Sequence, residues 1–176
     1  MKSAEELREL NRTRFIDQVC YVTEDYKRTI KYFTEMLDYG PWTIIENTND
    51  CAFNVKLNDK PVEEPWKFYI AFTKVGNMTI EVIQPELGQD PYSQFLKEKG
   101  HVIHHIKEII YSGDDNIRKY MDYLVEKGHP MTYEGEYMED IYYYIDTHKD
   151  TGAYYEVGNS AVCSGHPRLV GYYPEV

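Results

Sequence analysis

Two pairs of polar side chains of metal-binding type occur at matching places in the two halves of the sequence. Gln18 and His105 each lie in a segment that predicts a strand, and Glu81 and Glu156 each lie in a later strand-like segment among apolar or aromatic neighbours. A glutamate in such surroundings is costly unless it is paired or liganded. Because side chains alternate along a strand, both carboxylates should point away from the face on which their apolar neighbours pack. We therefore expect one amide, one imidazole and two carboxylates in a shared concavity, a set that suits a divalent ion such as Zn, Ni, Co, Mn or Fe(II).

The elements expected to carry Gln18 and Glu81, in the first half of the chain, are a strand, a helix and a set of further strands. A strand over residues 15–22 is followed by Thr23 as the expected N-cap and by a helix to about Leu37, whose apolar residues recur with the helical period. Gly40 and Pro41 end that helix. Breaks rich in Asn, Asp, Pro or Gly then separate four predicted strands, at residues 42–46, 52–57, 66–74 and 78–84.

The second half repeats this order. Beyond a short predicted helix at residues 92–99, a strand over 101–111 leads into a helix that begins at Asp114 and ends at Gly128, and strands are predicted at 131–133, 141–145 and 153–157. When Gln18 is placed on His105, the helical positions, the stopping glycines and the closing strands coincide. We expect one domain over residues 1–176 with an α+β fold, in which two βαβββ modules (15–84 and 101–158) form a cupped, barrel-like mixed sheet. The charged run 134–140 is expected to be a solvated loop, and the tail from residue 160 shows no usable periodicity.

Composition limits the classes of function. The 176 residues fit one ordinary domain, and 30 acidic against 19 basic residues give a net charge of −11, which argues against nucleic-acid binding. No apolar run approaches the roughly 20 residues of a membrane span, and the charged N-terminal segment lacks the apolar core of a secretory signal. The three cysteines, Cys20, Cys51 and Cys163, are widely spaced and odd in number. We expect a reduced, cytoplasmic protein in which Cys20 and Cys51 are small core residues.

The segments IDQV, LDYGPW, GNMTIEVIQPELGQDPYSQFLKEKG, HHI and YYYIDTHKDTGAYYEV follow one another in this order along the chain. Together they resemble the vicinal oxygen chelate superfamily of glyoxalase, bleomycin-resistance and dioxygenase proteins, and their order resembles that of its methylmalonyl-CoA epimerase-like branch. The set Gln, Glu, His, Glu resembles instead the ligands of animal-type glyoxalase I. The resemblance implies the glyoxalase-like fold, a small-molecule substrate, a homodimer, and one divalent metal ion held by Gln18, Glu81, His105 and Glu156. The likeness to glyoxalase I also implies that Glu156 is the catalytic base.

The sequence departs from these relatives at three places. Epimerases of this branch usually carry histidine where Gln18 stands, and bacterial ones carry a second acid on the strand that here reads KFYIAF, where Ile70 or a neighbour stands. Two-base epimerisation is therefore in doubt. Extradiol dioxygenases bind Fe(II) through two histidines and a carboxylate, and only His105 is available here.

The leading interpretation is a metal-dependent isomerase, epimerase or lyase that transfers a proton next to the carbonyl of a small oxo acid or thioester. An alternative is a metal-free protein that binds and sequesters a small molecule, as bleomycin-resistance relatives do. The 18 tyrosines favour this sequestration hypothesis, because tyrosine offers a large apolar face with a polar tip. A purely structural or interaction module is a third possibility.

Two further residues are expected to bind substrate. Lys107 lies two residues beyond His105, and Tyr154 lies two before Glu156, so alternation points both side chains into the cup. There Lys107 would hold a substrate carboxylate and Tyr154 would donate a hydrogen bond. The other interpretation of Lys107 is an ordinary solvent-exposed lysine. The same alternation sends His104 to the face opposite His105 and gives it a structural role.

Overall fold

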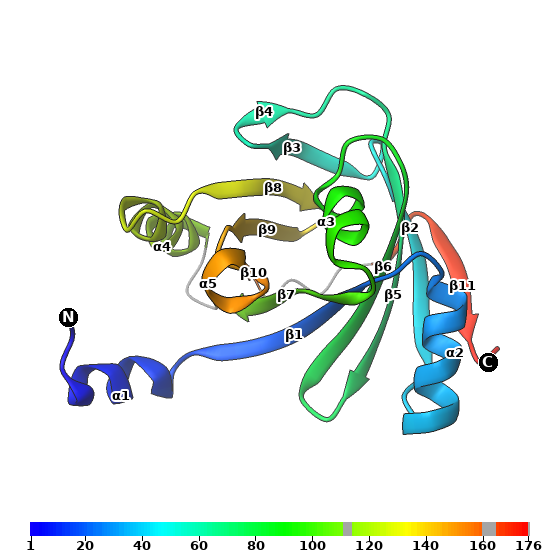
Figure 1. The fold of residues 1–176 in the computed structure, drawn as a ribbon, viewed down its shortest axis with the longest axis horizontal. Helices are drawn as coiled ribbons and strands as arrows, with labels where there is room; N and C mark the ends of the chain where they lie inside the picture. Colours follow the sequence, from blue (N-terminus) through cyan, green and yellow to red (C-terminus); the bar gives the residue numbers. More distant parts are fainter. Residues whose placement is uncertain (111–113, 160–164, 176) are drawn as a thin grey trace.

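The chain folds into one strongly curved sheet with helices around it, seen as a computed structural model that describes residues 1–110, 114–159 and 165–175 (Figure 1). The helices are α1 (Ala4–Arg12), α2 (Tyr26–Leu37), α3 (Pro91–Lys99), α4 (Asp114–Glu126) and α5 (His148–Thr151). The strands are β1 (Phe15–Val22), β2 (Trp42–Thr48), β3 (Ala52–Leu57), β4 (Lys60–Pro61), β5 (Lys67–Val75), β6 (Met78–Leu87), β7 (Val102–Ile109), β8 (Met131–Tyr137), β9 (Asp140–Ile145), β10 (Tyr154–Gly158) and β11 (Leu169–Tyr173). None of these helices is both long and apolar enough to cross a membrane.

The sheet contains the same strand arrangement twice. In the first copy β1 pairs in parallel with β6, and β5 and β2 follow outward; in the second, β7 pairs in parallel with β10, and β9 and β8 follow. The two first strands, β1 and β7, pair antiparallel and join the copies at the centre of the sheet. The predicted α+β fold with a cupped mixed sheet is thus confirmed.

Three elements differ from the expectation. The 52–57 strand (β3) does not extend the first copy: it crosses over and pairs with β8 of the second, followed by the short β4. The tail forms β11, an edge strand paired antiparallel with β2. The run 134–140 is not a solvated loop, because β8 continues to Tyr137 and the Glu134 side chain is buried.

The helix predicted after the first strand, which is α2, begins two residues later than expected. Asp25, not Thr23, is the N-cap of α2, and its carboxylate accepts a hydrogen bond from the Arg28 backbone N–H at 3.0 Å. The Thr23 hydroxyl instead accepts from the Asp25 backbone N–H and lies 2.9 Å from the Thr29 hydroxyl. Thr23 therefore orders the turn before the cap, a role that the same residue types can fill.

The helices α2 and α4 pack on the outside of the curve, and aromatic side chains, some of them from α3, fill its inside. Ile30 of α2 and Ile117 of α4, which coincide in the repeat, are 1% and 0% exposed and anchor two separate outer clusters. Each such burial contributes about 1.5–3 kcal/mol. A third cluster, on the concave side, includes many of the buried tyrosines and supports the candidate site.

Candidate metal centre in the cup

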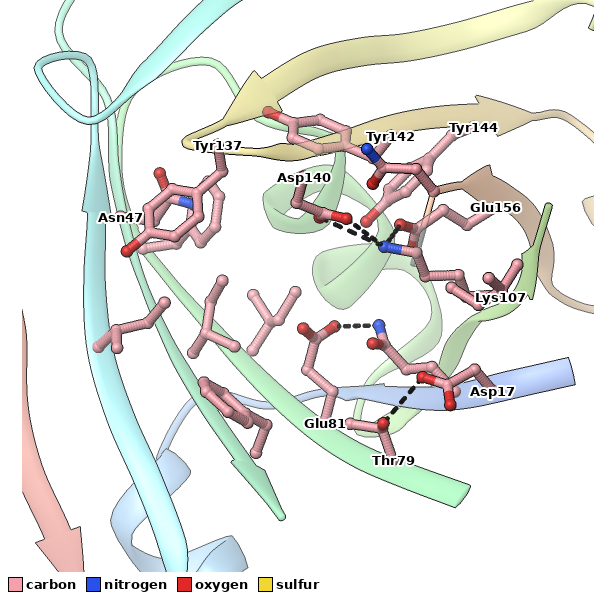
Figure 2. A pocket seen from close by; sticks show the side chains of 18 of the residues that line it. Asp17, Asn47, Thr79, Glu81, Lys107, Tyr137, Asp140, Tyr142, Tyr144 and Glu156 are labelled. Carbon is pink, nitrogen blue, oxygen red and sulfur yellow. Dashed lines mark hydrogen bonds and ion pairs between the residues drawn. The ribbon is translucent and has the colours of Figure 1, made fainter. Parts of the chain in front are cut away.

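A cavity of about 640 Å³ occupies the concave side of the sheet (Figure 2). One part of its surface is polar and includes Gln18, Glu81, Lys107, Asp140 and Glu156. The lining also includes apolar and aromatic side chains, among them Ile70, Phe72, Ile83, Tyr137, Tyr142 and Tyr144. The cavity is therefore amphiphilic, as sites for small organic molecules usually are.

Four side chains meet at the polar end, around Nε2 of His105. This atom lies 2.9 Å from Oε2 of Glu156, 3.4 Å from Oε2 of Glu81 and 3.2 Å from the amide nitrogen of Gln18. The Gln18 amide also donates to Glu81 at 3.0 Å. His105 is fully buried beneath the cavity surface, whereas the other three reach that surface. The structure thus brings together the four residues that the sequence proposed as ligands.

The strand pairing explains why these four meet. Gln18 is in register with Thr79 across the parallel β1–β6 pair, and His105 is in register with Tyr154 across the parallel β7–β10 pair. Glu81 and Glu156 each follow two residues later in β6 and β10, and so return to the same face of the sheet. The central β1–β7 pairing then places the two sets side by side.

Lys107 is a buried partner of the carboxylates. Its ammonium lies 3.1 Å from Asp140 and 3.0 Å from Glu156, and its side chain is 8% exposed, so it is not a surface lysine (Figure 2). The backbone of Gly158 makes room for it, because a Cβ there would come within 2.7 Å of the Lys107 Cε. Lys107 therefore lies in the cavity wall, with its charge directed at two carboxylates.

The charges of this cluster determine its protonation. Burial opposes charge on Glu156, but Lys107 and His105 outweigh it and lower the pKa of the Glu156 carboxyl to about 2. Burial likewise disfavours the charged His105, yet Glu156 and Glu81 raise the pKa of this imidazole to about 9. Burial raises the pKa of Asp140 to about 6 against the opposing effect of Lys107. At neutral pH the cluster holds ionised Glu156 beside two cations, protonated His105 and Lys107.

His104 and Tyr154 differ from their expected placement. The β1–β7 pairing is irregular beyond Cys20, which pairs with His105, so strict alternation fails there and both histidines are fully buried. Their Nδ1 atoms lie 2.9 Å apart, and the His104 ring packs edge-on against Tyr92. Tyr154 lies at the end of the cup, where its ring packs against His104 and His148 and is not part of the cavity lining.

The donor set fits a divalent metal ion. One imidazole nitrogen, two carboxylates and one amide converge, and the second ring nitrogen of His105 is held by His104, as the outer nitrogen of a ligating histidine usually is. Binding would displace the proton from His105.

Sequence reasoning missed two contributors to the cavity. Asp140 was assigned to a loop, yet it opens β9 and faces Lys107. His166, from the tail, lines the cavity and packs edge-on against Phe72, while Arg168 anchors the tail to Glu46 at 2.9 Å. No local periodicity marks His166, because its position depends on the pairing of β11 with a strand far away in the sequence.

The cupped sheet of two modules holds one polar cluster in its cavity. Residues 17–144 match the model of the glyoxalase/bleomycin resistance protein/dioxygenase superfamily, more than half of the chain, so the chain belongs to this superfamily. The suspected family is thereby confirmed. A search of curated protein sequences found no match.

Several solved structures share the fold. A hypothetical protein from Bacillus halodurans has a TM-score of 0.56 at 18% identity, over 88% of this chain and 99% of that one. A Streptomyces coelicolor methylmalonyl-CoA epimerase variant in complex with 2-nitronate-propionyl-CoA has a TM-score of 0.56 at 16% identity, over 84% and 97%. The epimerase from Mycobacterium tuberculosis has a TM-score of 0.57 at 15% identity, over 84% and 88%. Identities this low support the shared fold alone.

Proposed function

We propose that this protein is a metal-dependent isomerase, epimerase or lyase that transfers a proton at a carbon next to the carbonyl of a small oxo acid or thioester. The observation that carries the proposal is the meeting of Gln18, Glu81 and Glu156 around Nε2 of His105, at the polar end of a cavity. Membership of a superfamily with structurally similar methylmalonyl-CoA epimerases supports the class of reaction.

Each residue has a chemical role in this proposal. Gln18, Glu81, His105 and Glu156 hold one divalent ion of the Zn, Ni, Co, Mn or Fe(II) kind, which would supply positive charge beside a carbonyl oxygen. Glu156 takes the proton from the adjacent carbon, because it reaches the cavity surface and occupies the place of the base that the likeness to glyoxalase I implies. Ile70 lines the cavity where bacterial epimerases carry a second acid, so a second base at that place is missing.

The cavity wall indicates the kind of substrate. Lys107 has three N–H donors and is paired to Asp140 and Glu156, so it offers positive charge to a substrate carboxylate at the polar end. The aromatic side chains of the lining, Phe72 and Tyr137 among them, suit an apolar or planar group. We expect a compact molecule with a carboxylate or similar anion beside its carbonyl and an apolar remainder.

The test combines metal analysis with proton exchange. Metal content is measured on protein purified without chelator, and exchange at the α-carbon of 2-oxo acids and acyl-CoA thioesters, including methylmalonyl-CoA, is followed by NMR in D2O. Glu156→Gln should slow exchange by about 10²- to 10⁴-fold. Glu35→Gln, an exposed carboxylate on α2, is the matched control and should not change the rate. Protein that holds no metal and binds none when divalent ions are added would refute the proposal.

The tyrosine-rich wall favours a second candidate, metal-free sequestration of a planar compound in the same cavity. Tyr137, Tyr142 and Tyr144 line it together, and their rings can stack on an aromatic ligand. The two functions differ in their response to EDTA, because a bound ion stabilises the native state. Unchanged thermal stability on chelation, with tight binding of an aromatic probe such as a naphthalene sulfonate, would support sequestration.

A further inference from the structure

Cys20 lies next to two of the proposed ligands. It stands two residues beyond Gln18 on β1, on the same face, and is in register with Glu81 on one side and His105 on the other. The ligand atoms of Cys20, Glu81 and His105 all lie within 4.8 Å of one another, and Cys20 is 0% exposed. Ligand atoms around a tetrahedral zinc ion are about 3.5 Å apart, so a modest contraction would let all three bind one ion.

The repeat shows what distinguishes this position. Cys20 pairs with Glu81 in one module, and Lys107 pairs with Glu156 in the other, so Cys20 and Lys107 are equivalent places in the two copies. In the second module the carboxylate already has an ammonium at 3.0 Å. In the first module, the equivalent neighbour of Glu81 is an uncharged thiol. The less compensated negative charge of the centre is therefore on the Cys20 side.

A divalent ion would bind more favourably on that side. Lys107 repels a cation that approaches Glu156 and leaves the Glu81 side free of a competing ammonium. A thiolate also binds borderline and soft ions more strongly than an amide oxygen does, so Cys20 is a better donor than Gln18 for Zn or Co(II). Coordination by Cys20 would require loss of the thiol proton, which would be released to solvent.

We propose that Cys20 is a ligand of the metal centre, so that the ion is held by a thiolate together with Glu81 and His105. This inference rests on the proposed metal-dependent function and adds to it the chemical class of the ion. A thiolate, imidazole and carboxylate set should prefer Zn or Co(II) to Mn or Mg.

The experiment uses cobalt as a spectroscopic probe in a Cys163→Ala background, which leaves two cysteines. Metal-free protein is titrated with Co²⁺, and thiolate coordination gives a sulfur-to-cobalt charge-transfer band in the near ultraviolet, while visible d–d bands report binding by any ligands. We expect the charge-transfer band in the parent and in Cys51→Ala, whose deleted thiol is also buried but bonds to Asn47 and Thr48. We expect Cys20→Ala to lose the band and to bind Co²⁺ at least about 10- to 100-fold more weakly.

The outcomes separate the two proposals. Visible d–d bands without a charge-transfer band in the parent would overturn the role of Cys20 and leave the metal-dependent function intact. Absence of any cobalt binding in the parent would overturn both. If Cys20→Ala fails to fold, X-ray absorption on the zinc-loaded wild-type protein decides: a sulfur shell at about 2.3 Å supports the proposal, and a shell of nitrogen and oxygen alone overturns it.

Discussion

Replacing Lys107 by methionine should weaken the fold and strengthen metal binding at once. The ammonium lies between Asp140 and Glu156 at 3.1 and 3.0 Å, with a side chain 8% exposed. Removing one partner of a buried ion pair leaves an uncompensated charge and costs about 3–5 kcal/mol. For a chain of this length each kcal/mol shifts the midpoint of thermal unfolding by about 2–4 °C, so Lys107→Met should unfold about 6–20 °C lower in EDTA.

The effect on metal binding has the opposite sign. Lys107 and His105 share the Glu156 carboxylate, at 3.0 and 2.9 Å, so an ion that replaces the His105 proton faces the ammonium across one carboxylate. Unit charges about 4 Å apart repel by about 4 kcal/mol at an effective dielectric constant of 20, and water in the cavity reduces this. We expect Lys107→Met to bind Zn²⁺ at least about tenfold more tightly, a gain of about 1.4 kcal/mol.

The assay pairs thermal unfolding in EDTA with zinc competition against a chromophoric chelator. Lys74→Met is the matched control, because its ion pair with Asp17 has a similar 2.9 Å distance but a lysine side chain 60% exposed, and such pairs contribute at most about 1 kcal/mol. If the free energy of unfolding of Lys107→Met lay within about 1 kcal/mol of the wild-type value, the ion pair would not be desolvated. A loss of zinc affinity alongside the loss of stability would refute the electrostatic reasoning.

Three further predictions concern other places in the fold and the ligand. Arg14→Met should lower the free energy of unfolding in urea by about 1–3 kcal/mol. The substitution removes a guanidinium that donates two hydrogen bonds to Glu108, at 2.6 and 2.7 Å, and the Glu108 side chain is only 4% exposed. Gly88→Ala should lower the free energy of unfolding by more than about 2 kcal/mol, because φ is +89° and a Cβ would lie 2.3 Å from a backbone oxygen. Gly76→Ala should lower it by only about 1 kcal/mol, because φ is +61° but a Cβ there would lie in open space. Lys107→Met should weaken binding of an anionic ligand much more than that of a neutral analogue in calorimetry, and equal losses would contradict a charge-based role.

The parts of the site that could be predicted from the sequence depend on local signals. Strand alternation and the duplicated order of elements were enough to pair Gln18 with His105 and Glu81 with Glu156 as equivalent residues. In the structure Gln18 and His105 occupy equivalent positions in the two parallel strand pairs, in register with Thr79 and Tyr154. These signals succeed because most elements of a module follow one another in the chain, although β3 and β4 interrupt the first copy.

The parts that could not be predicted depend on contacts between distant segments. The crossing of β3 to β8 and the pairing of β11 with β2 join strands that no local pattern links. Alternation placed His104 and His105 on opposite faces, and the irregular β1–β7 pairing overrode it. Asp140 was hidden in a charged run, since sequence alone does not show that Lys107 lies beside it.

The charged cluster also breaks the rule that keeps charges out of protein interiors, and stability does not explain it. Lys107 and Glu156 are buried and Asp140 lies beside them, and filling such positions with apolar side chains of similar volume is often neutral or stabilising. Departures from local rules that carry no gain in stability tend to mark functional sites. Here the charged side chains line the same cavity as aromatic ones, and Glu156 pairs across the strands with Tyr144. That mixed lining suits a ligand with a polar, reacting end and an apolar remainder.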